Sequence, residues 1–115
     1  MSDREHSREM GIDEKLREEI VRRVRSVVLA DRIILFGAAA TGRMTKDSDI
    51  DLLVLETKLP DPRAERRRVR ESLRGLGYPF DIILMTTERF EESKNVIGGM
   101  AYPASKYGRV IYEAA

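Results

Sequence analysis

The fold is decided by residues 33–55, which read IILFGAAATGRMTKDSDIDLLVL. Two short runs within it, 33–36 and 52–55, consist of Ile, Leu, Val and Phe and are bounded by residues typical of turns. Short apolar runs with such boundaries predict buried β-strands. Gly37 ends the first run, and a loop with a second glycine leads to the other. The stretch therefore predicts two strands of one sheet, joined by a loop.

Two acidic residues open the second predicted strand. Asp49 and Asp51 are two positions apart, and side chains with this spacing point to the same face of a strand. Adjacent carboxylates repel each other, and a divalent cation with a preference for oxygen ligands relieves the repulsion. An Asp-x-Asp pair alone is mostly a turn or a solvated strand end. Here the small residues after Gly37 also expose backbone amides, which bind phosphate oxygens.

The combination resembles a known motif. Residues 36–38 (Phe-Gly-Ala) followed by 49–52 (Asp-Ile-Asp-Leu) are similar to the signature of the DNA polymerase β-like nucleotidyltransferase superfamily. Within it, the chain most resembles the minimal nucleotidyltransferases (MNT), from its first predicted helix to Tyr112. The resemblance implies the nucleotidyltransferase fold, an α/β (α+β) domain with a small mixed β-sheet flanked by helices.

The resemblance also assigns the site. Asp81 is the only charge in the predicted strand 80–85 and matches the third carboxylate of the family, although a strand-end residue bonded to a loop has the same pattern. The implied catalytic and metal-binding residues are Asp49, Asp51 and Asp81, holding two Mg²⁺ ions, with ATP or another nucleoside triphosphate as donor substrate. The expected nucleotide-binding residues are Gly37, Ala38, Arg43, Lys46 and Ser48.

Ala38 departs from the family pattern, which usually has Ser at this position. Ala keeps the backbone N–H but lacks the hydroxyl donor. A lost hydrogen bond to a charged group is worth roughly 1.5–3 kcal/mol, so activity is expected to fall by about one to two orders of magnitude. Thr41, Arg43 and Lys46 are candidates to supply the missing donor.

The rest of the chain predicts helices, strands and a tail around this centre. Residues 1–11 are polar and without period, which predicts a disordered tail before a domain at 12–115. The expected elements after the tail are a helix that begins at Asp13, a helix from Pro62 to about Gly75, a buried strand at 80–85, short helices at 88–95 and near 103–107, and a strand at 109–113.

Five arginines fall on one face of the predicted helix 62–75, namely Arg63, Arg66, Arg67, Arg70 and Arg74. A solvated face, an acidic protein partner and nucleic-acid phosphates are three readings of such a stripe. The net charge of only +1 favours a protein partner over nucleic acid.

Composition limits the chemistry. The chain has no cysteine, which excludes disulfides, thiolate metal sites and a cysteine nucleophile, and its one histidine, His6, lies in the predicted tail. No apolar run is long enough to span a membrane and no signal peptide is recognisable, so a cytoplasmic protein is expected.

The resemblance implies transfer of AMP from ATP to an acceptor hydroxyl, with a HEPN-type protein as partner in a toxin–antitoxin pair. Two alternatives stay open. One is a catalytically impaired MNT-like antitoxin that acts by complex formation. The other is a nucleic-acid-binding module that uses helix 62–75. The acceptor, the preferred triphosphate and homo-oligomer formation are also left open by the sequence.

Overall fold

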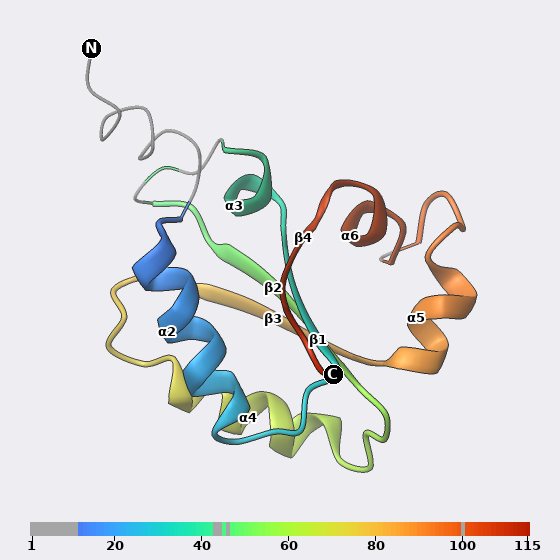
Figure 1. Cartoon of the computed structure of the whole chain (residues 1–115), viewed down its shortest axis with the longest axis horizontal. Coiled ribbons are helices and arrows are strands. Elements are labelled where there is room, and N and C mark those ends of the chain that lie inside the picture. Colours follow the sequence, from blue (N-terminus) through green and yellow to red (C-terminus); the bar gives the residue numbers. More distant parts are fainter. Residues whose placement is uncertain (1–11, 43–44, 46, 100) are drawn as a thin grey trace.

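The computed structural model describes residues 12–42, 45, 47–99 and 101–115, and within them a mixed four-stranded sheet carries helices on both faces (Figure 1). The predicted fold class is thereby confirmed, while the predicted tail at 1–11 lies outside the described residues. The elements in chain order are α2 (Glu14–Arg25), β1 (Arg32–Phe36), α3 (Ala38–Thr41), β2 (Ile50–Glu56), α4 (Pro62–Ser72), β3 (Phe80–Thr86), α5 (Thr87–Ser93), α6 (Ala101–Tyr107) and β4 (Arg109–Glu113).

The sheet has the strand order β3-β2-β1-β4. Strand β1 is antiparallel to both β2 and β4, whereas β2 and β3 are parallel and are connected through α4. A parallel pair needs such a crossover, and a helix usually supplies it. The consequence for the site is that β2 and β3 begin at the same end of the sheet, beside the end of β1.

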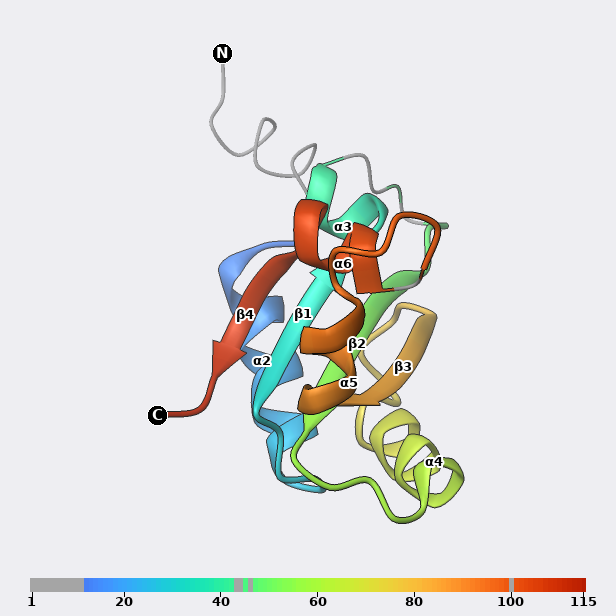
Figure 2. The ribbon, with the colours of Figure 1, turned by 90° about the vertical axis from the view of Figure 1, so that its right-hand side faces the viewer.

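Helices α2 and α4 cover one face of the sheet, and α5 and α6 cover the other (Figures 1 and 2). Along β2, Leu52 and Val54 pack into the cluster that includes α2 and α4, whereas Leu53 and Leu55 pack with Phe90 of α5. Because strand side chains alternate, Asp51 lies on the α5/α6 face. Among the described residues, none of the helices combines the length and apolarity needed to cross a bilayer.

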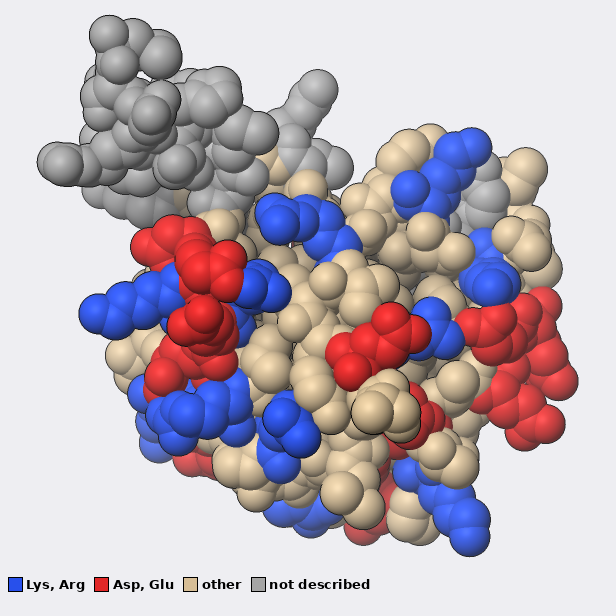
Figure 3. All heavy atoms as spheres, viewed as in Figure 1, with Lys and Arg blue, Asp and Glu red and all other residues tan. Residues whose placement is uncertain are grey.

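Charged side chains of both signs are interspersed over the face seen in Figure 3. Acidic residues gather over α5, at the right of this view, where Glu88, Glu91 and Glu92 are exposed. One of these carboxylates belongs to an ion-pair network, since Glu91 lies 2.7 Å from Arg32 Nη2 and 2.6 Å from Lys94 Nζ. The low net charge thus arises from mixed surfaces rather than from a scarcity of charge.

Helix α2 begins where the sequence predicts, because the Asp13 side chain accepts a hydrogen bond of 2.8 Å from the Leu16 amide. Helix α4 begins at Pro62, with Asp61 as its N-cap. It ends at Ser72, however, before the predicted end at Gly75.

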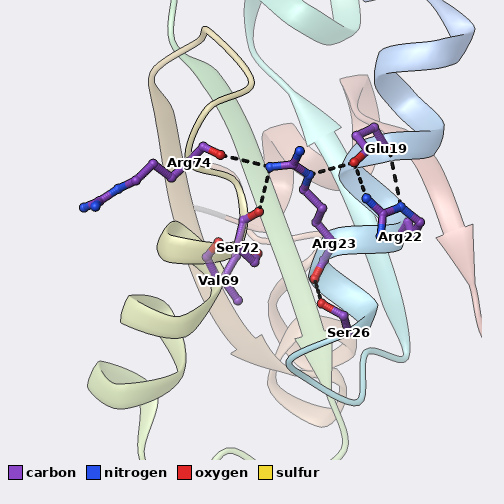
Figure 4. A network of polar contacts seen from close by, with 7 residues as sticks. All are labelled: Glu19, Arg22, Arg23, Ser26, Val69, Ser72 and Arg74. Atoms are coloured by element: carbon purple, nitrogen blue, oxygen red, sulfur yellow. Dashed lines mark hydrogen bonds and ion pairs between the residues drawn. The ribbon is translucent and has the colours of Figure 1, made fainter.

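A side chain of α2 binds the backbone at the end of α4 (Figure 4). The Arg23 guanidinium donates to the carbonyl oxygens of Ser72 at 3.1 Å and Arg74 at 2.9 Å, and its Nε donates to Glu19 at 2.7 Å. Carbonyls at a helix C-terminus lack partners within the helix, and Arg23 supplies donors to them. Gly75 then follows with φ +92, which turns the chain toward β3.

Strand β3 was expected to be buried, but it is an edge strand and is only partly buried. A side chain of α4 protects its open edge, since Arg66 Nε donates to the Ile82 carbonyl at 3.2 Å. Thr86 caps α5, which ends at Ser93 and not at Asn95. Strand β4 lies at 109–113, as the sequence predicts.

Candidate active site

The site is built on a register pair. Asp51 on β2 and Asp81 on β3 are Cα partners in the parallel ladder. The Ile50 amide donates to the Pro79 carbonyl at 2.9 Å and ties the starts of the two strands together. Partners in register point to the same face of a sheet. The structure therefore brings together two carboxylates that are far apart in sequence, on the α5/α6 face.

Asp51 is strained electrostatically by this arrangement. Partial burial raises the pKa of the Asp51 carboxyl, and the negative charges of Asp81 and then Asp49 raise it further. Asp81 and Asp49 themselves are exposed. A carboxylate that is disfavoured by burial and by neighbours of its own sign is stabilised by a cation.

Gly37 lies next to Asp51 on the side opposite to Asp81, because β2 runs between β3 and β1. Phe36, the last residue of β1, is the register partner of Asp51, and Gly37 follows it with φ +70. A Cβ atom on Gly37 would lie 2.2 Å from Asp51 Oδ2, a separation that no real contact has. Glycine is therefore required at this position both by backbone conformation and by the carboxylate beside it.

The turn at Gly37 leads into the single-turn helix α3. Gly37 is its N-cap, and the Ala40 amide donates to the Gly37 carbonyl at 3.1 Å. Ala38 is the first helical residue and is half-buried. The turn thus places the start of α3 next to the Asp51 carboxylate.

A metal ion fits the chemistry of these residues. Asp51 and Asp81 offer carboxylate oxygens that destabilise each other when both are ionised, which is the donor set that Mg²⁺ prefers. Asp49 lies one residue before β2 and is exposed, but acts on Asp51 electrostatically. In the described part of the chain, no three His, Cys, Asp or Glu side chains are already gathered as a metal cluster. The pair Asp51–Asp81 is thus the centre of the site, and Asp49 stands at its margin.

The remaining predicted nucleotide-binding residues lie in the loop between α3 and β2. Ser48 Oγ accepts a hydrogen bond of 3.0 Å from the Thr45 amide and lies 3.2 Å from Thr45 Oγ1. Its side chain therefore holds the loop, and contact with a nucleotide stays a prediction. Arg43 and Lys46 lie outside the described residues.

The arginine stripe of α4 is separate from this site. Helix α4 packs through Val69 on the sheet face opposite to Asp51, so the stripe does not line the carboxylate pair. Arg66 is bound to the β3 backbone, and Arg74 pairs with Glu71 at 2.9 Å. Three arginines of the stripe are exposed and form no ion pair with another described residue, namely Arg63, Arg67 and Arg70.

Sequence reasoning missed a pair of carboxylates at the far end of β2. Glu56, the last residue of β2, is 3% exposed, and it interacts with Glu65 of α4. The sequence does contain a signal for the burial of Glu56. Side chains alternate along β2, and Glu56 continues the positions of Leu52 and Val54, which point toward the buried face.

Comparisons with known proteins concern the family and the fold. Residues 14–102 match the family model of the nucleotidyltransferase domain. No curated protein matches the sequence.

Solved structures share the fold. One is a toxin–antitoxin with AMP-PNP, with a TM-score of 0.61 and 19% identity over 85% of this chain and 73% of that one. A mutant of the toxin–antitoxin MntA-HpeT has a TM-score of 0.60 and 16% identity over 85% of this chain and 73% of that one. A third is a tri-AMPylated Shewanella oneidensis HEPN toxin in complex with MNT antitoxin. It has a TM-score of 0.60 and 16% identity over 90% of this chain and 74% of that one. At these identities the likeness concerns the fold, whereas the family model spans most of the sequence. The chain therefore belongs to the nucleotidyltransferase domain family.

Proposed function

We propose that the protein is a metal-dependent nucleotidyltransferase that transfers AMP from ATP to a hydroxyl group of a HEPN-type partner protein. The observation that carries this proposal is the register pair Asp51–Asp81, of which Asp51 lies against the Gly37 turn. Membership of the family supports the reaction class. Similar folds in a toxin–antitoxin with AMP-PNP and in a complex with an AMPylated HEPN toxin support the donor and the partner.

In this reaction the acceptor oxygen forms a bond to the α-phosphorus of ATP. The bond from that phosphorus to the α,β-bridging oxygen breaks, and pyrophosphate leaves with the electron pair. The acceptor proton passes to the Asp81 carboxylate, which lies at the exposed edge of the pair and is accessible to an incoming hydroxyl.

Asp49, Asp51 and Asp81 would hold Mg²⁺, which when bound offsets negative charge on the triphosphate and on the leaving pyrophosphate. The chain's own contribution is placement. The Ala38 amide, at the start of α3, is assigned to the terminal phosphates of ATP, next to the carboxylates. Catalysis then rests on positioning and charge stabilisation, for which few side chains suffice.

The test is transfer of label from ATP in the presence of Mg²⁺ and a HEPN-type protein. Label at the α-phosphate should appear on the partner, and label at the γ-phosphate should not, because AMP and not a phosphoryl group is transferred. Replacing ATP by its α,β-methylene analogue should abolish transfer, since the scissile oxygen is missing.

Asp51→Asn should abolish the transfer, and Glu18→Gln is the matched control. Glu18 is exposed on α2, on the opposite side of the sheet, so it makes the same change of charge away from the site. Transfer of γ-label, or equal transfer by wild type and Asp51→Asn, would refute the proposal.

A second candidate is an MNT-like antitoxin with impaired catalysis, and Ala38 favours it. The methyl group of Ala38 stands at the first position of α3, where the family usually has a hydroxyl. This candidate predicts that wild type and Asp51→Asn bind the HEPN-type protein with equal affinity in calorimetry, and that neither transfers label. Salt-sensitive binding of oligonucleotides that is lost on neutralising Arg63, Arg67 and Arg70 would instead support a nucleic-acid-binding module.

A further inference from the structure

A second acidic site lies at the other end of β2, on the face that α2 and α4 cover. The Oε2 atoms of Glu56 and Glu65 are both buried, and neither accepts a hydrogen bond from a described residue. Five positions of extended strand separate Glu56 from Asp51, or about 17 Å, and the two side chains lie on opposite faces. The Glu56–Glu65 pair is therefore independent of the nucleotide site.

Charges from each neighbouring element leave this pair negative. Asp31 adds a third carboxylate, whose oxygens already accept hydrogen bonds from two threonines. Arg68 forms an ion pair with Glu65, with 3.6 Å between Nη2 and Oε1, which is beyond hydrogen-bond distance and leaves both Oε2 atoms without a donor, and Lys58 forms no ion pair with a described residue. Burial, and then the charge of Glu65, raise the pKa of Glu56 to about 7. A buried carboxylate pair whose negative charge is not balanced by its neighbours needs a proton or a cationic ligand.

A cavity of about 500 Å³ opens beside the pair. This volume is in the range of small-ligand sites. Its walls are apolar at Val27, Val28 and Leu29, which follow α2. Its polar lining consists of three carboxylates, Asp31, Glu56 and Glu65, together with Thr57 and one cation, Lys58. The terminal torsion of Glu is soft, so rotation of the two carboxyl groups presents their oxygens to the cavity that they line.

We propose that this cavity binds an alkylguanidinium group, with Glu56 and Glu65 as its carboxylate partners. A guanidinium presents paired N–H donors that match carboxylate oxygens, and the apolar wall suits the aliphatic stem. The same chemistry is offered by a small free guanidine and by an arginine side chain of another protein.

The test uses the ¹⁵N-labelled full chain and titration with 1-butylguanidine, followed by the amide signals of Val28, Leu29 and Thr57. A blocked Ala-Arg-Ala peptide in a parallel titration distinguishes a protein-borne arginine from a free guanidine by relative affinity. Saturable shifts in the millimolar range are expected at pH 8. Binding should weaken about tenfold at pH 6, where a Glu56 of pKa about 7 is largely protonated.

Neutral 1-butylurea, which has the same shape, is the ligand control and should give no saturable shift. Glu56→Gln/Glu65→Gln should abolish binding of butylguanidine, whereas Glu88→Gln/Glu92→Gln, which removes two exposed charges from α5, should not. The proposal is overturned if neither guanidinium probe gives saturable shifts, if butylurea gives equal shifts, or if the Glu56/Glu65 variant binds butylguanidine as the wild type does. It is also overturned if the amide signals respond to pH but to neither probe, because the pair then holds only a proton. The ligand control and the comparison of pH 8 with pH 6 use the wild-type protein, so they decide the matter even if the variant fails to fold.

Discussion

Gly37 and Asp51 lie so close together that a methyl group on Gly37 would stand 2.2 Å from the Asp51 carboxylate oxygen. The first prediction follows from this contact. Gly37→Ala should lower activity by at least about 100-fold and destabilise the fold by more than the roughly 1–2 kcal/mol that a positive φ costs an alanine. Gly75→Ala is the control, because Gly75 has φ +92 and, its two chain neighbours aside, no atom of the described residues lies within 4 Å of the added Cβ. Equal unfolding free energies for the two variants in urea denaturation would show that the carboxylate contact is unimportant.

The second prediction concerns the carboxylate pair. Asp51→Asn and Asp81→Asn should each reduce transfer of AMP by at least about 100-fold, since each removes a charge that positions the metal and the triphosphate. Each should leave the melting temperature unchanged or raise it, because repulsion between the two carboxylates is relieved. Activity assays and thermal melts on the same preparations test this. A large drop in melting temperature would indicate a structural role instead.

Ala38 provides a gain-of-function test. Ala38→Ser restores a hydroxyl at the first residue of α3 and should increase AMP transfer by about tenfold, the equivalent of about 1.4 kcal/mol in the barrier. Ala39→Ser is no suitable control because Ala39 is fully buried, so exposed Ser105→Ala is used. Rates that do not change would mean that the donor is supplied elsewhere or that the chain is inactive.

The link between α2 and the end of α4 predicts a stability effect. Arg23→Ala removes hydrogen bonds to the carbonyls of Ser72 and Arg74 and should destabilise the fold by about 1–3 kcal/mol. Arg22 is the matched control, since it is exposed and, among the described residues, its side chain pairs only with Glu19, so that Arg22→Ala should cost less than about 1 kcal/mol. Denaturant unfolding measures both. Similar losses for the two variants would contradict the role of Arg23 in holding the helices together.

Glu56 predicts a pH dependence of stability. Its pKa is raised to about 7, whereas in the unfolded chain it titrates near its ordinary 4.5. Between these values the folded protein binds more protons, so stability from this group is lost as pH rises from about 4.5 to 7. Between pH 5 and pH 8 the melting temperature of the wild type should therefore fall by roughly 5 °C more than that of Glu56→Gln.

Two other carboxylates act in the opposite direction and outside that window. Ion pairs lower the pKa of Glu19 to about 2 and lower that of Glu91. Their stabilising contribution is lost only as pH falls below the ordinary value of about 4.5. The measurement for Glu56 is the melting temperature of wild type and of Glu56→Gln at each pH from 5 to 8. If the difference between the two melting temperatures stays constant over this range, Glu56 does not titrate in it.

Much of the fold follows from local patterns in the sequence. The apolar runs predict β1 and β2, Asp13 and Pro62 mark the starts of α2 and α4, and Thr86 marks the start of α5. These features depend on side-chain periodicity and on caps that act within a few residues. The chemical type of the site residues was also predictable, because an Asp-x-Asp after a glycine turn resembles a family signature.

Other features depend on residues that meet only in three dimensions. The end of α4 depends on Arg23, which is some 50 positions away, and the partial burial of β3 depends on its place at the sheet edge. The buried Glu56–Glu65 pair arises because α4 packs on the end of β2. Apart from the strand alternation that turns Glu56 toward the buried face, these contacts leave no periodic trace in the sequence.

The sequence by itself determined which residues form strands and helices and which carboxylates are available for a metal site. The tertiary structure decided that Asp51 and Asp81 are register partners and that Gly37 lies against Asp51. The physical reason is that alternation along a strand defines the face of each side chain, whereas the register between two strands is set by the crossover and the packing that connect them.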